Sequence, residues 1–404
     1  MPAKLKILTV IGTRPEAIKL APVIRELDRR AESSDLESIV CSTAQHREML
    51  DQVLEVFSIR PDYDLQVMER NQTLIQTAAS VLSRLEPVLN EVKPDWVLVQ
   101  GDTTTVMSAA IAAFYSGCKV GHVEAGLRSF DRSQPFPEEI NRRLAGVVAD
   151  LHFAPTESAQ ANLIREGIAT DQVVVTGNTV VDALQWAVER PDQPGLDSIL
   201  SKLNPSDEDH DPSGGSEDRE KKLILVTAHR RENFGRPIED ICLALKDIAE
   251  SHGDSVHIVY PVHRNPNILK PVHDILGETK NVTLMDPVDY LMMVQLMKSA
   301  YIVLTDSGGI QEEAPTLSKP VLVLRRVTER PEAMESGTAI TVGTDRQRIV
   351  SEVYRLLEDE SAYRSMAQAA SPYGDGKAAA RIVALLLGEN VEPFNPAAMT
   401  GREH

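Results

Sequence analysis

The sequence predicts an α/β protein made of two doubly wound parallel domains, and three observations support this prediction. Short apolar runs, such as residues 6–12 (KILTVIG), alternate with longer helical stretches, such as residues 105–117 (TVMSAAIAAFYSG). Continuous apolar runs are typical of strands covered on both faces, and their alternation with helices indicates a parallel sheet. The rhythm stops after residue 190 and restarts near residue 222, in a chain of 404 residues, which is longer than one hydrophobic core usually serves.

Strand-like runs follow one another along both halves of the chain. They include residues 6–12, 95–102, 119–126 and 173–178 in the first half, and residues 222–229, 256–263, 281–286, 301–309, 320–325 and 338–343 in the second. We therefore expect an N-terminal Rossmann-like domain at residues 1–185, a connection at residues 186–221, a C-terminal Rossmann-like domain at residues 222–372 and a C-terminal helix and tail at residues 373–404. The final helix could complete the second domain or cross back onto the first.

Residues 204–220 (NPSDEDHDPSGGSEDRE) interrupt the pattern between the two expected domains. The segment carries seven acidic residues and one arginine, together with proline and glycine, and has no helical or strand periodicity. Such a composition cannot bury enough apolar surface to form a core. We therefore interpret it as an acidic surface insertion or a solvated linker.

The charge and composition of the chain indicate which classes of binding partner are disfavoured. The chain has 42 Lys and Arg against 60 Asp and Glu, and its net charge of −18 disfavours nucleic acid and anionic membranes as partners. It enters its first strand without a signal-peptide pattern, and no run approaches 18 uninterrupted apolar residues, so a cytoplasmic protein is expected. Neither a metal-ligand spacing nor the G-x-G-x-x-G dinucleotide fingerprint is present, so we expect no metal and no cofactor.

The stretch LTDSGGIQEEA (residues 304–314) places two glycines and then two glutamates at the end of an expected strand. Glycines let a phosphate approach the backbone, and the N–H groups of the following helix favour an anion. Glu313 follows Gly309 by about one helical turn, so its carboxylate could accept hydrogen bonds from a sugar diol such as a ribose. The alternative is a tight turn in which Glu312 and Glu313 only complement the helix dipole.

Two further strand ends carry cationic groups that could bind anions. Arg14 and Lys19 lie near the loop that follows the first strand, where Gly12 ends the apolar run. His229 stands beside two arginines in residues 227–231 (TAHRR). An arginine can fork onto phosphate oxygens, whereas a lysine supplies a point charge. The alternative for the first loop is an ordinary solvated helix surface.

Acidic residues follow several expected strands of the first domain. They are Asp102, Glu124, Glu138 and Glu139. Asp102 precedes three threonines and could simply cap a helix. Several acids at neighbouring strand ends could instead form a carboxylate cluster with altered proton affinity.

Together these segments resemble the non-hydrolysing UDP-N-acetylglucosamine 2-epimerases. The resemblance runs in order over nearly the whole chain, through GTRPEAIKLAP, TAQHREMLDQVL, GDTTT, GHVEAGLR, PEEINRR, TGNTVVDAL, TAHRRENFG, YPVHRNPN, TDSGGIQEEAP, ERPEA and SPYGDG. It implies a GT-B-like fold with an interdomain cleft, a second domain that binds UDP and a C-terminal helix that returns to the first domain. It also implies a homodimer with UDP-N-acetylglucosamine and UDP-N-acetylmannosamine as its ligands.

The reaction implied by the resemblance is reversible inversion at C2 of the sugar. UDP would leave C1, the C2 proton would be lost to give a 2-acetamidoglucal, and UDP would add back after protonation on the other face. The product would supply activated N-acetylmannosamine for surface polysaccharides. A GT-B glycosyltransferase, a hydrolysing epimerase and a non-catalytic nucleotide-sugar sensor are the competing hypotheses.

The resemblance also assigns site residues. The catalytic group would be Asp102, Glu124, Glu138 and His229, the last at the diphosphate end of the site. The substrate-binding group would be Arg14 and Lys19 for the phosphates, Ser307, Gly308 and Gly309 for the diphosphate, Glu313 for the ribose, and Arg330. A second, regulatory substrate site could involve Gln45, His46 and Arg47, although these polar residues could simply open a helix.

Overall fold

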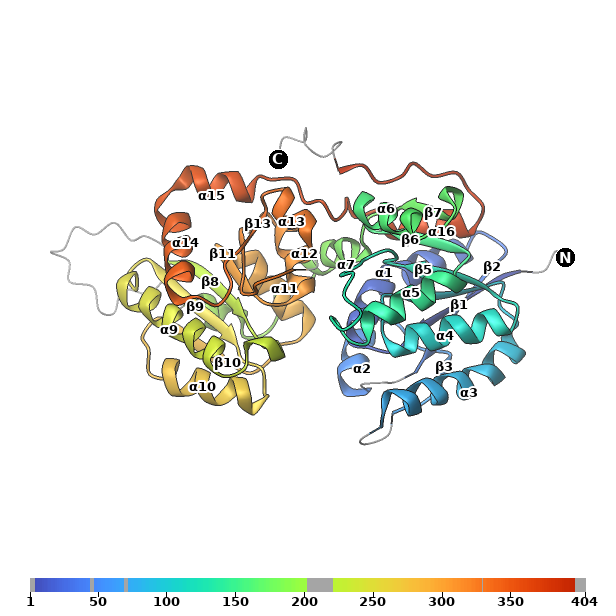
Figure 1. Ribbon diagram of the computed structural model, residues 1–404, viewed down its shortest axis with the longest axis horizontal. Coiled ribbons are helices and arrows are strands. Elements are labelled where there is room, and N and C mark those ends of the chain that lie inside the picture. Colours follow the sequence, from blue (N-terminus) through green and yellow to red (C-terminus); the bar gives the residue numbers. More distant parts are fainter. Residues whose placement is uncertain (1–3, 44–46, 69–71, 202–220, 329, 397–404) are drawn as a thin grey trace. The chain divides into compact units, whose positions relative to one another are not determined.

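The computed structural model describes residues 4–43, 47–68, 72–201, 221–328 and 330–396. The chain divides into two compact units, and Figure 1 labels most of their elements. Unit 1 comprises residues 1–185 and 373–404, and unit 2 comprises residues 186–372. Residues 186–201, expected to be a connection, cluster with unit 2. The acidic segment at 204–220 and the regulatory candidates Gln45 and His46 lie outside the described residues, as does the side chain of Arg47.

Unit 1 is built on a seven-stranded parallel sheet with the order β3-β2-β1-β4-β5-β6-β7. Its strands are β1 (Leu5–Ile11), β2 (Leu36–Ser42), β3 (Tyr63–Asp64), β4 (Trp96–Gln100), β5 (Lys119–Val123), β6 (Leu151–Ala154) and β7 (Val173–Val175). Its helices are α1 (Arg14–Ala31), α2 (Arg47–Val56), α3 (Leu74–Val92), α4 (Thr104–Tyr115), α5 (Glu138–Val148), α6 (Glu157–Arg165), α7 (Thr179–Val188), which runs into unit 2, and α16 (Ala378–Leu386).

Unit 2 repeats this architecture on a six-stranded parallel sheet with the order β10-β9-β8-β11-β12-β13. Its strands are β8 (Lys222–Thr227), β9 (Val256–Pro261), β10 (Val282–Met285), β11 (Ile302–Thr305), β12 (Val321–Val323) and β13 (Ala339–Thr341). Its helices are α8 (Leu196–Leu200), α9 (Arg236–Ser251), α10 (Pro266–Leu276), α11 (Tyr290–Ser299), α12 (Gly308–Thr316), α13 (Pro331–Glu335), α14 (Arg346–Glu358) and α15 (Glu360–Ala367).

The inner strands are mostly buried because helices cover both faces of each sheet. Every residue of β4 and of β9 is buried. Continuous apolar strands of this kind suit a parallel sheet enclosed on both sides. The predicted fold class, an α/β protein with two doubly wound Rossmann-like domains, is therefore confirmed.

The C-terminal segment from Tyr373 belongs to unit 1, where α16 packs against α1. Backbone pairing anchors the segment, since the amide of Asn178 donates to the carbonyl of Tyr373 at 2.7 Å. Of the two placements that the sequence left open for the final helix, the structure has the one beside the N-terminal strands. Among the helices described, none is long and apolar enough to cross a membrane.

Candidate functional site

Both sheets reverse their strand order at one point, and most of the predicted site residues that the structure describes lie around these points. In unit 1 the order reverses at β1, which pairs with both β2 and β4. In unit 2 it reverses at β8, which pairs with both β9 and β11. Ligands of doubly wound proteins bind outside the carboxyl ends of the strands at such points. The loops after β1, β4, β5, β8 and β11 are therefore the candidate functional site of each unit.

Glu124 follows β5 directly, and its carboxylate joins three polar side chains at the edge of the unit 1 sheet. Its backbone φ of 61° lies in the left-handed region, which costs energy for a residue with a side chain and is common at functional positions. Its carboxylate forms an ion pair with Lys19 and accepts hydrogen bonds from Gln100 and Asn178, the latter at 3.1 Å. Both members of the ion pair are at most one-tenth exposed. The structure thus brings two predicted site residues, Lys19 and Glu124, into contact.

Asp102 lies two residues beyond β4, next to the strand that Glu124 follows. The last residues of these strands, Gln100 and Val123, are register partners, so both acids occupy the same edge of the sheet. The Asp102 carboxylate is 2.6 Å from Arg142 on α5, and it remains about one-quarter exposed. Arg142 is an ionic partner that the sequence analysis did not identify.

Two neighbouring acids at the start of α5 have different surroundings. Glu138 is half-buried, whereas Glu139 is fully buried. Glu139 accepts hydrogen bonds from the backbone of Ser129 at 3.0 Å and Phe130 at 3.3 Å, and it forms ion pairs with Arg142 and Arg143. Glu139 therefore stabilises the loop before α5, whereas Glu138 is the more exposed of the two acids.

Glu16 is a further buried acid at the same edge, and the sequence analysis passed over it. Its carboxylate accepts hydrogen bonds from the backbone of Gly12 at 2.6 Å and from the hydroxyl groups of Thr13 at 3.0 Å and Thr103 at 2.7 Å. It therefore ties the start of α1 to the residue next to Asp102. Burial raises the pKa of Glu16 to about 7, against the lowering effect of these hydrogen bonds. The capping-box spacing from Thr13 to Glu16 was the signal that could have identified it.

Arg14 begins α1 and is half-buried. Thr13 precedes it as the N-cap residue, and Pro15 occupies the first turn, where a missing N–H costs nothing. The guanidinium is thus carried by a rigid helix start at the carboxyl end of β1, in the same turn as Glu16.

Asp306 is the centre of the equivalent edge of unit 2. It is fully buried directly after β11, and its Oδ2 accepts hydrogen bonds from the backbone amides of His229 and Arg230, both at 2.8 Å, and from the side chain of Asn233 at 2.9 Å. The His229 ring is 42% exposed, with Nδ1 3.5 Å from Asp306 Oδ1. Burial lowers the pKa of His229, as do His263 and Arg230, whereas Asp306 opposes this shift.

The glycine pair begins α12 immediately after this aspartate. Ser307 is the N-cap residue, but its side chain accepts no capping hydrogen bond, and a Cβ added to Gly309 would meet nothing closer than Glu313 Oε2, at 4.0 Å. The first turn of α12 therefore has room for a ligand beside its N–H groups, and a carboxylate lies next to that space. Such a helix start favours an anion.

The two adjacent glutamates of α12 are both buried, but they have distinct neighbours. Glu312 forms an ion pair with Arg330, in which both side chains are at most one-tenth exposed. Thr328 ties the same loop to α12 by donating to Gln311 at 2.6 Å. Arg330 is therefore joined to α12 through Glu312, and Glu313 is the acid beside Gly309.

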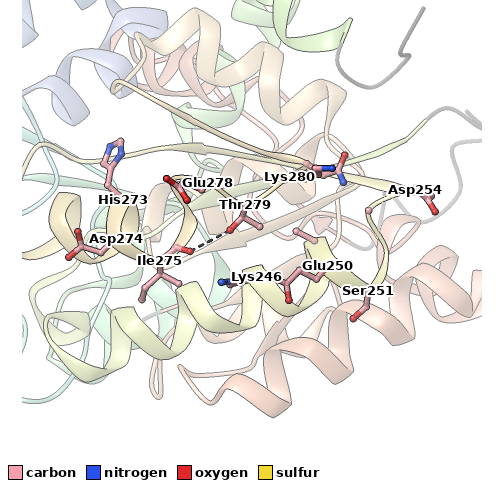
Figure 2. A pocket seen from close by; sticks show the side chains of 13 residues that line it. Lys246, Glu250, Ser251, Asp254, His273, Asp274, Ile275, Glu278, Thr279 and Lys280 are labelled. Atoms are coloured by element: carbon pink, nitrogen blue, oxygen red, sulfur yellow. Dashed lines mark hydrogen bonds and ion pairs between the residues drawn. The ribbon is translucent and has the colours of Figure 1, made fainter. Parts of the chain in front are cut away.

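Unit 2 also has a surface depression of about 830 Å³ that lies elsewhere (Figure 2). Its lining comes from the C-terminal ends of α9 and α10 and from the loops before β9 and β10, with Lys246, Glu250, Asp274 and Lys280 among its charged residues. These loops lie at the amino ends of the strands, and none of the predicted site residues lines the depression. It is therefore separate from the candidate site.

Comparisons with known proteins match nearly the whole length of the chain. A family model described as UDP-N-acetylglucosamine 2-epimerase matches residues 28–387. A protein named UDP-N-acetylglucosamine 2-epimerase from Escherichia coli (strain K12) is 54% identical over 387 residues, covering 96% of this chain and 100% of the relative.

Solved structures agree with the sequence comparisons. The UDP-GlcNAc 2-epimerase from Neisseria meningitidis bound to UDP-GlcNAc is 48% identical with a TM-score of 0.85, over 95% of this chain and 100% of that one. The UDP-GlcNAc 2-epimerase from Methanocaldococcus jannaschii in complex with UDP-GlcNAc and UDP is 34% identical with a TM-score of 0.76, again over 95% and 100%.

Proposed function

Because this chain belongs to the UDP-N-acetylglucosamine 2-epimerase family, we propose that it interconverts UDP-N-acetylglucosamine and UDP-N-acetylmannosamine by inverting C2 without net hydrolysis. The family makes the protein an isomerase. The observation that carries the proposal is the contact between Lys19 and Glu124 at the reversal point of unit 1, beside Asp102. This edge provides acidic groups for proton transfer and a cation for a developing anion.

The proposed reaction proceeds by elimination and re-addition. A C2 proton next to an intact C1 linkage is too weakly acidic for a carboxylate to remove. As the C1–O bond to UDP breaks, the oxocarbenium character at C1 acidifies the C2–H bond, and loss of that proton gives a 2-acetamidoglucal and UDP. Protonation of C2 on the opposite face and attack of a UDP oxygen on C1 then give the epimer. Atoms balance without a redox cofactor.

Asp102, Glu124 and Glu138 are the proposed proton-transfer groups. Their surroundings differ, since Glu124 is paired with Lys19, Asp102 faces Arg142, and Glu138 is half-buried at the start of α5. Different surroundings give carboxylates different proton affinities, which a reaction that needs both an acid and a base requires. Lys19 and the nearby Arg14 would stabilise the negative charge that develops on the leaving diphosphate.

We assign UDP binding to unit 2. The N–H groups at Ser307 to Gly309 would bind phosphate oxygens, and His229 would contact the diphosphate. Glu313 would accept hydrogen bonds from the ribose hydroxyls. Arg330 enters this assignment through its ion pair with Glu312, beside Glu313. We also propose that the enzyme acts as a homodimer and that its product supplies surface polysaccharide synthesis.

The test is turnover of UDP-N-acetylglucosamine alone in D₂O, followed by NMR. We expect UDP-N-acetylmannosamine to form reversibly, with deuterium at C2 of both sugars. Turnover with complete retention of the C2 hydrogen would refute the elimination. Free N-acetylmannosamine with UDP would identify a hydrolysing enzyme, a requirement for a sugar acceptor would identify a glycosyltransferase, and binding without turnover would identify a sensor.

A further inference from the structure

Hydrogen bonds fix the orientation of the Asp306 carboxylate, which lies beside the imidazole ring of His229. Three donors converge on Oδ2 of Asp306, two of them backbone amides, at 2.8–2.9 Å. Rotating the carboxylate would break these bonds inside a fully buried site, where an unsatisfied donor costs about 1–3 kcal/mol. The orientation of the carboxylate is therefore fixed by the backbone of the loop that carries His229.

With Oδ2 occupied in this way, Oδ1 is the oxygen that faces the imidazole. It lies 3.5 Å from Nδ1 of His229 and has no hydrogen-bond partner among the described residues. A buried carboxylate oxygen is an acceptor only, so the ring nitrogen opposite it is favoured in its protonated form. The other nitrogen, Nε2, is then the one available to a ligand.

The charged groups around His229 come from three segments. Asp306 follows β11 and attracts a proton to the ring, whereas Arg230, in the loop after β8, and His263, in the loop after β9, repel one. The ring of His263 stacks on His229 with centroids 5.6 Å apart. Asp306 thus opposes both repulsive neighbours and the effect of burial.

We propose that Asp306 is the positioning residue of His229: it accepts from Nδ1–H and stabilises the protonated ring, so that Nε2–H donates to an anionic group bound at the first turn of α12. The chain order supports this assignment because Ser307 follows Asp306 directly and Gly308 begins the helix. The Asp306 carboxylate therefore orients the His229 ring and is adjacent in the chain to the predicted phosphate-binding turn. The identity of the anion, the diphosphate of a nucleotide sugar, rests on the proposed function. The orientation of the ring does not.

Asp306→Asn tests the proposal because the three groups that donate to Oδ2 determine the orientation of the new side-chain amide. They require an acceptor, so the amide oxygen takes the place of Oδ2 and the NH₂ group faces Nδ1 of His229. The amide then donates to Nδ1, and the neutral ring must carry its proton on Nε2. In ¹⁵N spectra of histidine-labelled protein, assigned with a His229→Gln variant, we expect the Nδ1–H form in the wild type and the Nε2–H form, with a lower pKa, in Asp306→Asn.

Kinetics of the same variant provide the functional readout. We expect kcat for UDP-N-acetylglucosamine to fall about tenfold or more, as expected when a donor to a developing anion is weakened, and to fall by a larger factor than KM rises. Because the protonated ring is the form that donates to the anion, the basic limb of the pH profile should also move to lower pH in the variant, which a general loosening of the loop would not produce.

Asn233→Ser is the matched control, because it removes one donor to Oδ2 while Oδ1 still faces Nδ1. It should leave the tautomer of His229 unchanged. The proposal is overturned if Asp306→Asn keeps the wild-type tautomer and pKa, or if Asn233→Ser shifts both equally. Should Asp306→Asn not fold, the wild type alone decides, since a neutral Nε2–H form there contradicts the pairing. Because the spectra need no substrate, the pairing can stand even if the D₂O experiment refutes the proposed reaction.

Discussion

At the scale of single residues, Glu16 is the acid whose protonation should change most on folding. Burial raises its pKa from 4.5 to about 7. A raised folded-state pKa means that Glu16 favours folding most below pH 4.5 and that this contribution is lost as the pH rises towards 7. We predict that the free energy of unfolding of the wild type, relative to Glu16→Gln, falls by about 3 kcal/mol between pH 4.5 and pH 8.

Chemical denaturation over this pH range measures the difference. The glutamine can satisfy the same partners, since its oxygen can accept from the backbone of Gly12 and its NH₂ group can donate to the hydroxyls of Thr13 and Thr103. Glu55→Gln, an exposed glutamate on α2, is the control and should show no such slope. A relative stability of the wild type that grows with pH would contradict the prediction and indicate that the hydrogen bonds outweigh burial.

At the scale of elements, α16 begins with a cap supplied from another helix. Its own N-cap residue, Lys377, makes no side-chain capping bond. Asp182 of α7 instead accepts from the backbone amides of Ala378 at 3.3 Å and Ala379 at 2.9 Å. We predict that Asp182→Ala lowers the free energy of unfolding by about 1–3 kcal/mol, because it leaves these buried donors without an acceptor.

Hydrogen exchange locates the effect of this substitution. The amides of the first turn of α16 should lose protection in Asp182→Ala and lose less in Asp182→Asn, which keeps one acceptor oxygen. Amides of α14 in unit 2 serve as the internal reference. Unchanged protection of α16 in the alanine variant would show that α1 alone holds the helix in place.

At the scale of the whole molecule, the two units differ in how the chain builds them. Unit 2 is one continuous stretch, residues 186–372, with its own sheet and core, whereas unit 1 needs residues 373–404 as well as residues 1–185. The returning helix buries Ile382, Val383 and Leu386. We predict that residues 186–372 fold when expressed alone and that residues 1–185 alone are less stable than unit 1 by about 5 kcal/mol or more, from the loss of these three side chains.

Thermal unfolding by circular dichroism and light scattering would compare the fragments. Adding a peptide of residues 373–404 should raise the midpoint of unfolding of the N-terminal fragment and reduce its aggregation. A peptide in which Ile382 and Val383 are replaced by serine is the matched control and should not. A fragment 1–185 that already unfolds cooperatively, with a midpoint that the peptide does not change, would contradict the prediction.

Much of the fold could be read from local patterns in the sequence. The run at residues 6–12 anticipates β1 at Leu5–Ile11, and the run at residues 301–309 anticipates β11 followed by the first turn of α12. These readings succeed because a buried parallel strand requires a continuous apolar run and its carboxyl end requires a loop. The same rule places the polar strand-end residues at common edges, since all strands of a parallel sheet end on one side.

The partners of the site residues could not be read in this way. Glu124 contacts Lys19, which is 105 positions earlier in the chain, and Asp306 accepts from the backbone at His229, 77 positions earlier. Contacts between residues so far apart in the chain produce no periodic pattern in the sequence. Which acid is buried is equally hidden, since Glu138 and Glu139 are neighbours of the same type and only the packing of α5 separates their roles.

The sequence by itself determined that the chain forms two parallel α/β domains and which strand ends carry polar groups, because both follow from the local alternation of apolar and polar residues. Only the tertiary structure decided that α16 packs with α1, that Glu16 is enclosed by neutral donors, and that Asp306 faces Nδ1 of His229. Those features depend on burial and on contacts between segments far apart in the chain. Burial sets the cost of a charge and remote contacts set its partner, so the chemistry of each acid is established only when the chain has folded.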